Sequence, residues 1–215
     1  MHPHWPFFDL VVRTPRLELR YPDDELVVDV VALAARGIHD PATMPFSEPW
    51  TDEPSPHLER NSCRFFWRTR ADLTPDDWHL PLAVLVDGQP VGVQGIMAKS
   101  FPVRRVVSTG SWLGQAHQRR GLGKEMRAAV LHLGFAGLDA QVAQSEAWHD
   151  NEASLAVTRA LGYGPNGGRI DVRRGAPTRM LSFELDRAAW ETRRRDDIHL
   201  EGLEPCLPLL GVASS

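Results

Sequence analysis

A basic, glycine-rich stretch, HQRRGLGKEM, occupies residues 117–126 and leads directly into a segment with apolar residues at helical spacing. The spacing predicts a helix over 121–138, with the glycines at its start. The start of a helix presents backbone N–H groups that lack intrahelical acceptors, together with a partial positive charge. Glycines leave those N–H groups uncovered. The stretch therefore predicts a seat for an anion, most simply a phosphate group.

Two familiar phosphate loops do not fit this stretch. A nucleotide-triphosphate loop needs Ser or Thr after its Gly-Lys pair to bind magnesium, and Glu125 stands there instead. A dinucleotide-binding loop needs a third glycine for close helix packing, and Met126 occupies that place. We exclude both types of nucleotide site.

Apolar periodicity and turn residues also predict the elements that would position this loop. The loop follows a predicted strand and precedes a second strand and helix, so the centre of the chain is a mixed α/β unit. In chain order we expect a strand at 14–20, a helix at 23–37, a hairpin at 80–98, a strand at 104–114, the helix at 121–138, a strand at 141–149, a helix at 151–163, a hairpin over 169–186 and a helix at 187–195.

Residues 39–77 differ in character from the rest of the chain. They are rich in proline, carry Phe46 and Trp50, and include a short predicted helix at 62–73. We interpret them as an insertion on the substrate side of a single domain that spans 1–195. The tail, 196–215, has no clear pattern, and we expect it to be disordered or to dock on a neighbour.

Composition limits the possible functions. The chain has 215 residues and a formal net charge of −4, which fits one α/β domain and argues against a nucleic-acid partner. The amino terminus lacks a signal-peptide pattern, and the most apolar early window is far shorter than the ~20 residues of a membrane helix. We therefore expect a cytoplasmic protein without a membrane partner. Cys63 and Cys206 follow no metal or redox spacing, so we expect free thiols and no metal.

Three segments together resemble a known family. Residues 118–123, QRRGLG, resemble the Gln/Arg-x-x-Gly-x-Gly/Ala signature of the GNAT superfamily of acyl-coenzyme A N-acyltransferases. Residues 151–163, NEASLAVTRALGY, resemble the Asn-x-x-Ser…Leu-Gly-Phe/Tyr segment of its ribosomal-protein N-terminal acetyltransferase branch. Residues 14–20, TPRLELR, are typical of that branch's first strand. Residues 44–50 and 80–88 are similar to an actinobacterial subgroup that includes a mycobacterial succinyltransferase.

The resemblance implies a single-domain GNAT-like α/β fold with a mixed, mostly antiparallel sheet and helices on both faces. In this fold the fourth strand, here 104–114, ends in a bulge and splays from the fifth, here 141–149, and the acyl-CoA lies in the gap. N–H groups of residues 119–124 would hold its pyrophosphate, and Arg119, Arg120 or Lys124 would reach the 3′-phosphate. The implied cofactor-binding residues are Trp112, Leu113, Gly114, Gln118, Arg119, Arg120, Gly121, Leu122, Gly123, Lys124, Asn151 and Ser154.

The resemblance also suggests catalytic roles. Glu146 is the expected base that takes the amine proton through water, and His149 is the alternative. The N–H of Leu113 would stabilise the oxyanion, and Ser154 would meet the departing sulfur. Many relatives use a tyrosine as the acid, seven residues after the Asn, but this chain has Thr158 there.

These residues predict an N-acyltransferase that moves an acetyl group from acetyl-CoA to a primary amine by direct attack. The acceptor would be a small molecule or a peptide, and assembly as a homodimer is one option. One alternative is a succinyl-CoA-dependent enzyme, in which a cation would face the extra carboxylate; the candidates are Arg64, Arg68, Arg104 and Arg105. The other alternative is a CoA-binding module without turnover.

Overall fold

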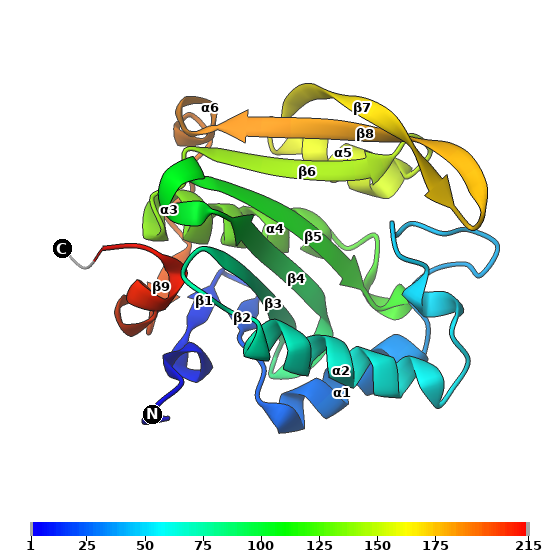
Figure 1. The fold of residues 1–215 in the computed structure, drawn as a ribbon, viewed down its shortest axis with the longest axis horizontal. Coiled ribbons are helices and arrows are strands. Elements are labelled where there is room, and N and C mark those ends of the chain that lie inside the picture. Colours follow the sequence, from blue (N-terminus) through cyan, green and yellow to red (C-terminus); the bar gives the residue numbers. More distant parts are fainter. Residues whose placement is uncertain (1, 214–215) are drawn as a thin grey trace.

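The computed structural model describes residues 2–213, which form one α/β domain (Figure 1). Within these residues a nine-stranded sheet has the order β7-β8-β6-β5-β4-β3-β2-β1-β9. Only the β5–β6 pair is parallel. The strands are β1 (Val11–Arg13), β2 (Glu18–Arg20), β3 (Asp77–Val86), β4 (Gln89–Lys99), β5 (Val106–Leu113), β6 (Val142–Trp148), β7 (Gly164–Arg173), β8 (Ala176–Asp186) and β9 (His199–Glu201).

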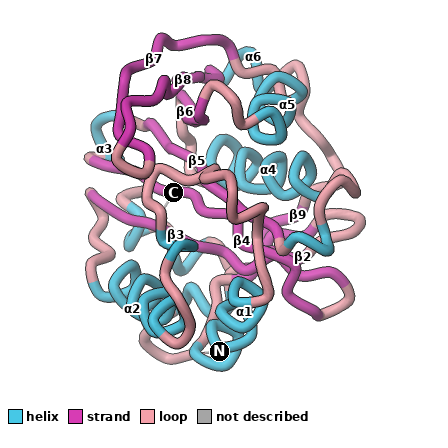
Figure 2. Tube along the Cα trace, turned by 90° about the vertical axis from the view of Figure 1, so that its right-hand side faces the viewer, coloured by secondary structure: helices cyan, strands magenta, loops and turns pink. Residues whose placement is uncertain are grey.

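Helices cover both faces of the sheet, as Figure 2 shows. They are α1 (Asp24–Ala35), α2 (His57–Ala71), α3 (Phe101–Arg104), α4 (Leu122–His132), α5 (Glu152–Ala160) and α6 (Arg187–Glu191), with a π-helical turn (Leu133–Gly137) extending α4. Helices α1 and α2 pack on one face of the sheet, and α4 and α5 lie on the other. The mixed, mostly antiparallel GNAT-like architecture expected from the sequence is confirmed.

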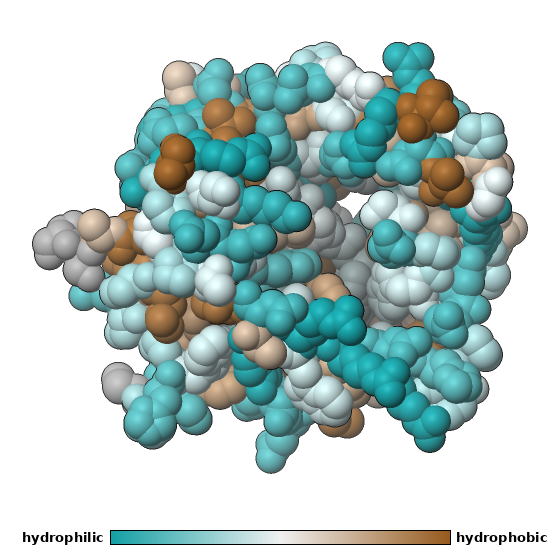
Figure 3. All heavy atoms as spheres, viewed as in Figure 1, coloured by the Kyte–Doolittle hydropathy of each residue, from teal (hydrophilic) through white to brown (hydrophobic). Residues whose placement is uncertain are grey.

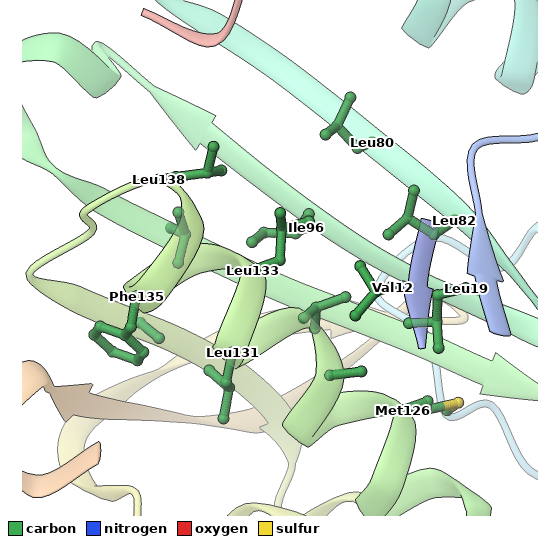
Figure 4. Packing of buried hydrophobic residues seen from close by; sticks show 14 of the residues in the cluster. Val12, Leu19, Leu80, Leu82, Ile96, Met126, Leu131, Leu133, Phe135 and Leu138 are labelled. Atoms are coloured by element: carbon green, nitrogen blue, oxygen red, sulfur yellow. The ribbon is translucent and has the colours of Figure 1, made fainter. Parts of the chain in front are cut away.

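The alternation of strand side chains explains how two cores form. Leu80 and Leu82 of β3 point toward α4 and join the main core, whose packing Figure 4 shows. Ala83 and Leu85 of the same strand point the other way and pack with α1 and α2. Because β3 is buried on both faces, it reads in the sequence as a nearly continuous apolar run.

Local capping signals place several elements where the sequence predicted them. The carboxylate of Asp23 accepts a hydrogen bond from the N–H of Leu26 at 2.9 Å and caps α1. Asp87 and Gly88 both adopt positive φ and form the turn of the β3–β4 hairpin. The helix at 23–37 and the hairpin at 80–98 are confirmed.

Some predicted elements differ from the structure, including the hairpin expected over 169–186, whose first strand, β7, begins at Gly164. The single strand at 14–20 is wrong, because a turn at Thr14–Leu17 divides it into the antiparallel pair β1–β2. Helix α2 begins at His57, five residues before its expected start, and α6 ends at Glu191 rather than at 195. A local bond from the N–H of Thr14 to the carbonyl oxygen of Leu17 closes the turn, and α2 begins directly after Pro54 and Pro56, whose carbonyl oxygens accept its first N–H groups.

The segment after residue 195 continues the domain. Strand β9 pairs antiparallel with β1 and forms an edge of the sheet. Cys206 and Leu210 are fully buried, and the indole N–H of Trp78 donates to the carbonyl oxygen of Leu210 at 3.2 Å. Burial raises the pKa of the Cys206 thiol to about 12, and both Cys206 and Cys63 are free thiols. The segment therefore docks on the chain's own sheet.

Candidate active site

Strands β5 and β6 part along most of their length. They pair only from Val106 to Ser108 of β5, against Val142 to Gln144 of β6. Both strands continue beyond these pairs without pairing with each other, so the expected splay is confirmed (Figure 1). The space-filling view is hollowed here, between the β6–β8 layer and α2 (Figure 3). The expected bulge is wrong for the paired region, because the β4–β5 register is continuous up to Leu113.

Three residues at the end of β5 were expected to pair with a pantetheine arm, but they do not all direct their backbone N–H and C=O groups to the same side of the strand. The N–H of Gly114 donates to the carbonyl oxygen of Val91 at 2.9 Å, so it faces β4 and is not available to a pantetheine arm. Successive residues of a strand direct their N–H and C=O groups to opposite sides. Trp112 therefore faces β4 as well, and the backbone groups of Leu113 face the gap. The indole of Trp112 packs beside Trp50, with ring centroids 6.1 Å apart.

The loop before α4 presents uncapped N–H groups, as its glycines predict. Gly121, at φ 79°, is the N-cap residue and provides no side chain to satisfy the first turn. The first helical bond runs from the N–H of Glu125 to the carbonyl oxygen of Gly121. Within residues 2–213 the N–H groups of Leu122, Gly123 and Lys124 meet no acceptor. A helix start with uncapped N–H groups of this kind is a favourable position for an anion.

Three cationic side chains surround this turn. Arg119, Arg120 and Lys124 are all exposed. Their charged groups form no hydrogen bond or ion pair in the part of the chain that the structure describes. The arrangement leaves three exposed positive charges beside an exposed row of amides.

Gln118 anchors the loop. Its side-chain amide donates to the carbonyl oxygen of Ile38 at 2.5 Å and to that of Leu113 at 2.9 Å. The second bond occupies the carbonyl of Leu113, which leaves its N–H as the polar group that faces the gap. The signature glutamine thus ties the end of β5 to the loop after α1.

A buried carboxylate holds the other side of the loop, and no sequence pattern indicated it. Glu125 is 5% exposed and accepts hydrogen bonds from the hydroxyl of Thr14 at 2.6 Å and from Nε of Arg16 at 2.7 Å. Nη1 of Arg16 also donates to the carbonyl oxygen of Arg120 at 3.1 Å. Burial alone would raise the pKa of Glu125, but the bonds from Thr14 and Arg16 outweigh it and lower that pKa. The β1–β2 turn therefore holds the first turn of α4.

The start of α5 lies next to the start of α4. The side-chain oxygen of Asn151 accepts the N–H of Ser154 at 3.2 Å, so Asn151 caps the helix, and its amide group donates to Pro45. A methyl group on Gly123 would lie 3.7 Å from Val157. Ser154 and Val157 are three residues apart and share a helix face. Ser154 therefore lies on the side of α5 that faces the first turn of α4.

Glu146, the expected base, is exposed and ion-paired. It pairs with the guanidinium of Arg169 on β7, and the hydroxyl of Ser182 donates to it at 3.1 Å. The bonds from Arg169 lower the pKa of Glu146 below its ordinary value. A carboxylate in this setting is ionised at neutral pH, but it accepts a proton weakly. His149, also exposed, forms no side-chain hydrogen bond with any described residue.

The α1–α2 loop (residues 36–56) lies beside the far ends of β6 and the β7–β8 hairpin (Figure 1). The indole N–H of Trp148 donates to the carbonyl oxygen of Phe46 at 3.0 Å. Arg174, in the β7–β8 turn, pairs with Asp52, with Nε 2.8 Å from the carboxylate. The proline-rich segment is thereby tied across the wide end of the gap.

Two of the cations considered for a succinyl carboxylate lie elsewhere. Arg104 and Arg105 precede β5, at the opposite end of that strand from Leu113. Among residues 2–213 no cluster of His, Cys, Asp or Glu could hold a metal ion. No helix in the described part of the chain is long and apolar enough to cross a membrane.

Comparison with known proteins agrees with this geometry. The sequence model of the acetyltransferase (GNAT) domain matches residues 16–164, well over half of the chain. Mycobacterium smegmatis RimJ, in complex with CoA disulfide, is similar in structure with a TM-score of 0.70 at 21% identity, covering 87% of this chain and 91% of that one. A GCN5-related N-acetyltransferase from Brucella melitensis gives 0.66 at 17% identity, over 84% and 80% of the two chains.

A third solved structure, of the ribosomal-protein alpha-N-acetyltransferase RimL in complex with coenzyme A, gives a TM-score of 0.62 at 16% identity, covering 83% of this chain and 99% of that one. At these identities the similarity shows a shared fold. The splayed strands, the uncapped glycine loop and the match to the family model agree: the chain belongs to the GNAT acetyltransferase family, whose members are N-acetyltransferases.

Proposed function

We propose that this protein transfers the acetyl group of acetyl-CoA to a primary amine by direct attack of the amine on the thioester. One observation carries the proposal: the first turn of α4 leaves three N–H groups without acceptors among the described residues, beside the free edge of β5. The pyrophosphate of the donor would bind there, and Arg119, Arg120 or Lys124 would contact the 3′-phosphate.

Within this proposal the pantetheine arm lies in the gap between β5 and β6. The N–H of Leu113 points into the gap and would donate to the oxyanion that forms when the amine attacks. Ser154 would donate a proton to the departing thiolate, because it lies on the side of α5 that faces the first turn of α4 and its hydroxyl forms no hydrogen bond with the described residues. Asn151 would contact the pantetheine amide only by giving up its bond to Pro45.

Glu146 is the proposed proton acceptor, acting through water, with His149 as the alternative. The amine must lose a proton because an ammonium ion has no lone pair. The pair with Arg169 keeps Glu146 ionised, so its carboxylate can accept a proton at neutral pH, although the same pair makes it a weak base. The α1–α2 loop would line the acceptor side, where Glu53 adds negative charge, while the charge of Asp52 is paired with Arg174.

The test measures thiol release from acetyl-CoA and from succinyl-CoA with a panel of primary amines. We expect acetyl-CoA to be the better donor with at least one amine. Faster release from succinyl-CoA would favour the succinyltransferase alternative. Binding of coenzyme A without turnover of either donor would favour a CoA-binding module.

Variants at Gly123 test the donor seat. A Cβ atom there would lie 3.7 Å from Val157 and 3.9 Å from Leu113, which is ordinary contact, so Gly123→Ala should fold and serve as the matched control. The two further methyl groups of Gly123→Val would crowd the exposed amides. We expect calorimetry to show weaker CoA binding by the valine variant, with an unchanged melting temperature. Equal affinity in both variants would contradict the assigned seat.

A further inference from the structure

Arg127, on α4, is a buried cation without an acidic partner. The residue is 4% exposed, and it forms no ion pair with any carboxylate among residues 2–213. Its Nη1 donates to the hydroxyl of Ser145 at 3.0 Å, and its Nη2 lies 3.3 Å from the hydroxyl of Ser111. Its buried Nε has no acceptor in the described part of the chain. Buried arginines are normally paired, so this arrangement calls for an explanation.

The two serines belong to the two strands that part. Ser111 lies on β5, three residues beyond its last residue paired with β6, and Ser145 lies on β6, one residue beyond its last paired residue. One guanidinium therefore joins the two strands just where their own hydrogen bonds stop. Its planar fork holds two acceptors at a fixed separation, which an ammonium cannot do.

The groups that interact with Arg127 carry no compensating negative charge. The hydroxyl of Tyr163 interacts with Arg127, and burial raises the pKa of Tyr163, so it stays neutral at physiological pH. Two neutral serine hydroxyls complete the set of partners. Burying a cation without an acidic partner costs free energy that an apolar side chain of similar length would not cost. Fold stability alone therefore does not account for an arginine at this position.

We propose that Arg127 is a positioning residue for the donor: by bridging Ser111 and Ser145 it sets the separation of β5 and β6 where the pantetheine arm lies. This inference rests on the proposed function, because it assumes that the donor occupies the gap. Without the bridge the strands would relax toward or away from each other, and the backbone of Leu113 would lose its alignment with the donor.

The test compares Arg127→Met and Arg127→Lys with the wild-type protein. We expect Arg127→Met to melt at or above the wild-type temperature but to bind coenzyme A about tenfold more weakly, since small misplacements of binding groups have effects of this order. Arg127→Lys keeps the charge but cannot span both serines, so its affinity should lie between the two. In steady-state kinetics the loss should appear mainly as a higher KM for acetyl-CoA.

Three further measurements make the test decisive. The double variant Ser111→Ala/Ser145→Ala removes the bridge without altering the arginine, and it should reproduce the loss of affinity if Arg127→Met does not fold. Arg187→Met removes another hydrogen-bonded arginine, outside the gap, and should leave CoA affinity unchanged. Hydrogen exchange should rise in peptides covering β5 and β6 of the bridge variants.

Wild-type affinity for coenzyme A in both Arg127→Met and the double serine variant would overturn the proposal while leaving the proposed function intact. A lower melting temperature with unchanged affinity would assign Arg127 to fold stability alone. A wild-type protein that fails to bind coenzyme A would remove both this inference and the proposed function.

Discussion

Substitution of Arg16 by Met tests whether the β1–β2 turn holds the donor loop. The change removes the guanidinium from Glu125, which is 5% exposed, and leaves that carboxylate only the hydroxyl of Thr14 and a backbone N–H. Breaking a buried ion pair by removing one partner costs about 3–5 kcal/mol. Because the Arg16 side chain is 51% exposed, we expect the loss to lie lower, at about 2–3 kcal/mol. For a chain of this length that is a fall of roughly 5–10 °C in Tm.

The pH dependence of this loss follows from the sign of the pKa shift. The folded-state pKa of Glu125 lies below its ordinary value of 4.5, so its stabilising contribution is complete above that value and disappears as the pH falls through the folded pKa. Without the Arg16 guanidinium, Glu125 loses part of what lowers its pKa, so that pKa moves upward from its wild-type position. The difference in unfolding free energy between wild type and variant should therefore be constant near neutral pH and shrink at acid pH.

Urea unfolding across this pH range measures the effect, with Arg20→Met as the matched control. Arg20 lies on the same hairpin and pairs with Glu18 at the surface, so its loss should cost at most about 1 kcal/mol. Arg16 also holds the carbonyl of Arg120, so Arg16→Met should weaken CoA binding, and Arg20→Met should not. Equal stability of the two variants at neutral pH would refute the buried anchor.

Two further substitutions test the gap and the base. A Cβ atom on Gly92 would collide with the backbone of β5, so Gly92→Ala should displace β5 from β4, and both Tm and CoA affinity should fall; unchanged values of both would contradict this packing. Glu146→Gln should lower kcat without changing CoA affinity. Because Arg169 lowers the pKa of Glu146, the carboxylate is already ionised at neutral pH, and the rise of kcat/KM toward alkaline pH should belong to the acceptor amine and persist in the variant. Unchanged kcat would remove Glu146 from the reaction.

Sequence patterns predicted the parts of the fold that local signals determine. Helix α1 has an aspartate cap and a one-sided apolar face, and the β3–β4 hairpin has an Asp-Gly turn, so both could be identified without the structure. The glycine loop could also be identified from the sequence, because an uncapped helix start needs only a glycine followed by apolar residues at helical spacing. The residues that determine each of these features lie within a few positions of it in the sequence.

Features decided by distant residues could not be predicted in the same way. Strand β9 is short and gains its hydrogen bonds from β1, about 190 residues away in the chain. The partner of Glu146 comes from β7, which lies in a hairpin that shows no charge pattern pointing to it. Arg127 interrupts the apolar face of α4. It was the one local sequence feature that pointed to the bridge between β5 and β6, since a charged residue among buried neighbours is unusual.

Helix α4 combines three tasks within its first two turns, and this combination explains its sequence. Its first N–H groups must stay exposed to receive an anion, so no side chain can cap them, and the turn would otherwise be poorly held. Glu125 holds it from the side of the β1–β2 turn, but adds a negative charge close to the anion seat; Arg16 neutralises that charge. Arg127, two residues later, faces the parted strands. Acidic and basic residues therefore alternate along this apolar helix because they form two separate anchors, Glu125 to the β1–β2 turn and Arg127 to the parted strands. Each anchor leaves the N–H groups at the helix start exposed and its partial positive charge in place.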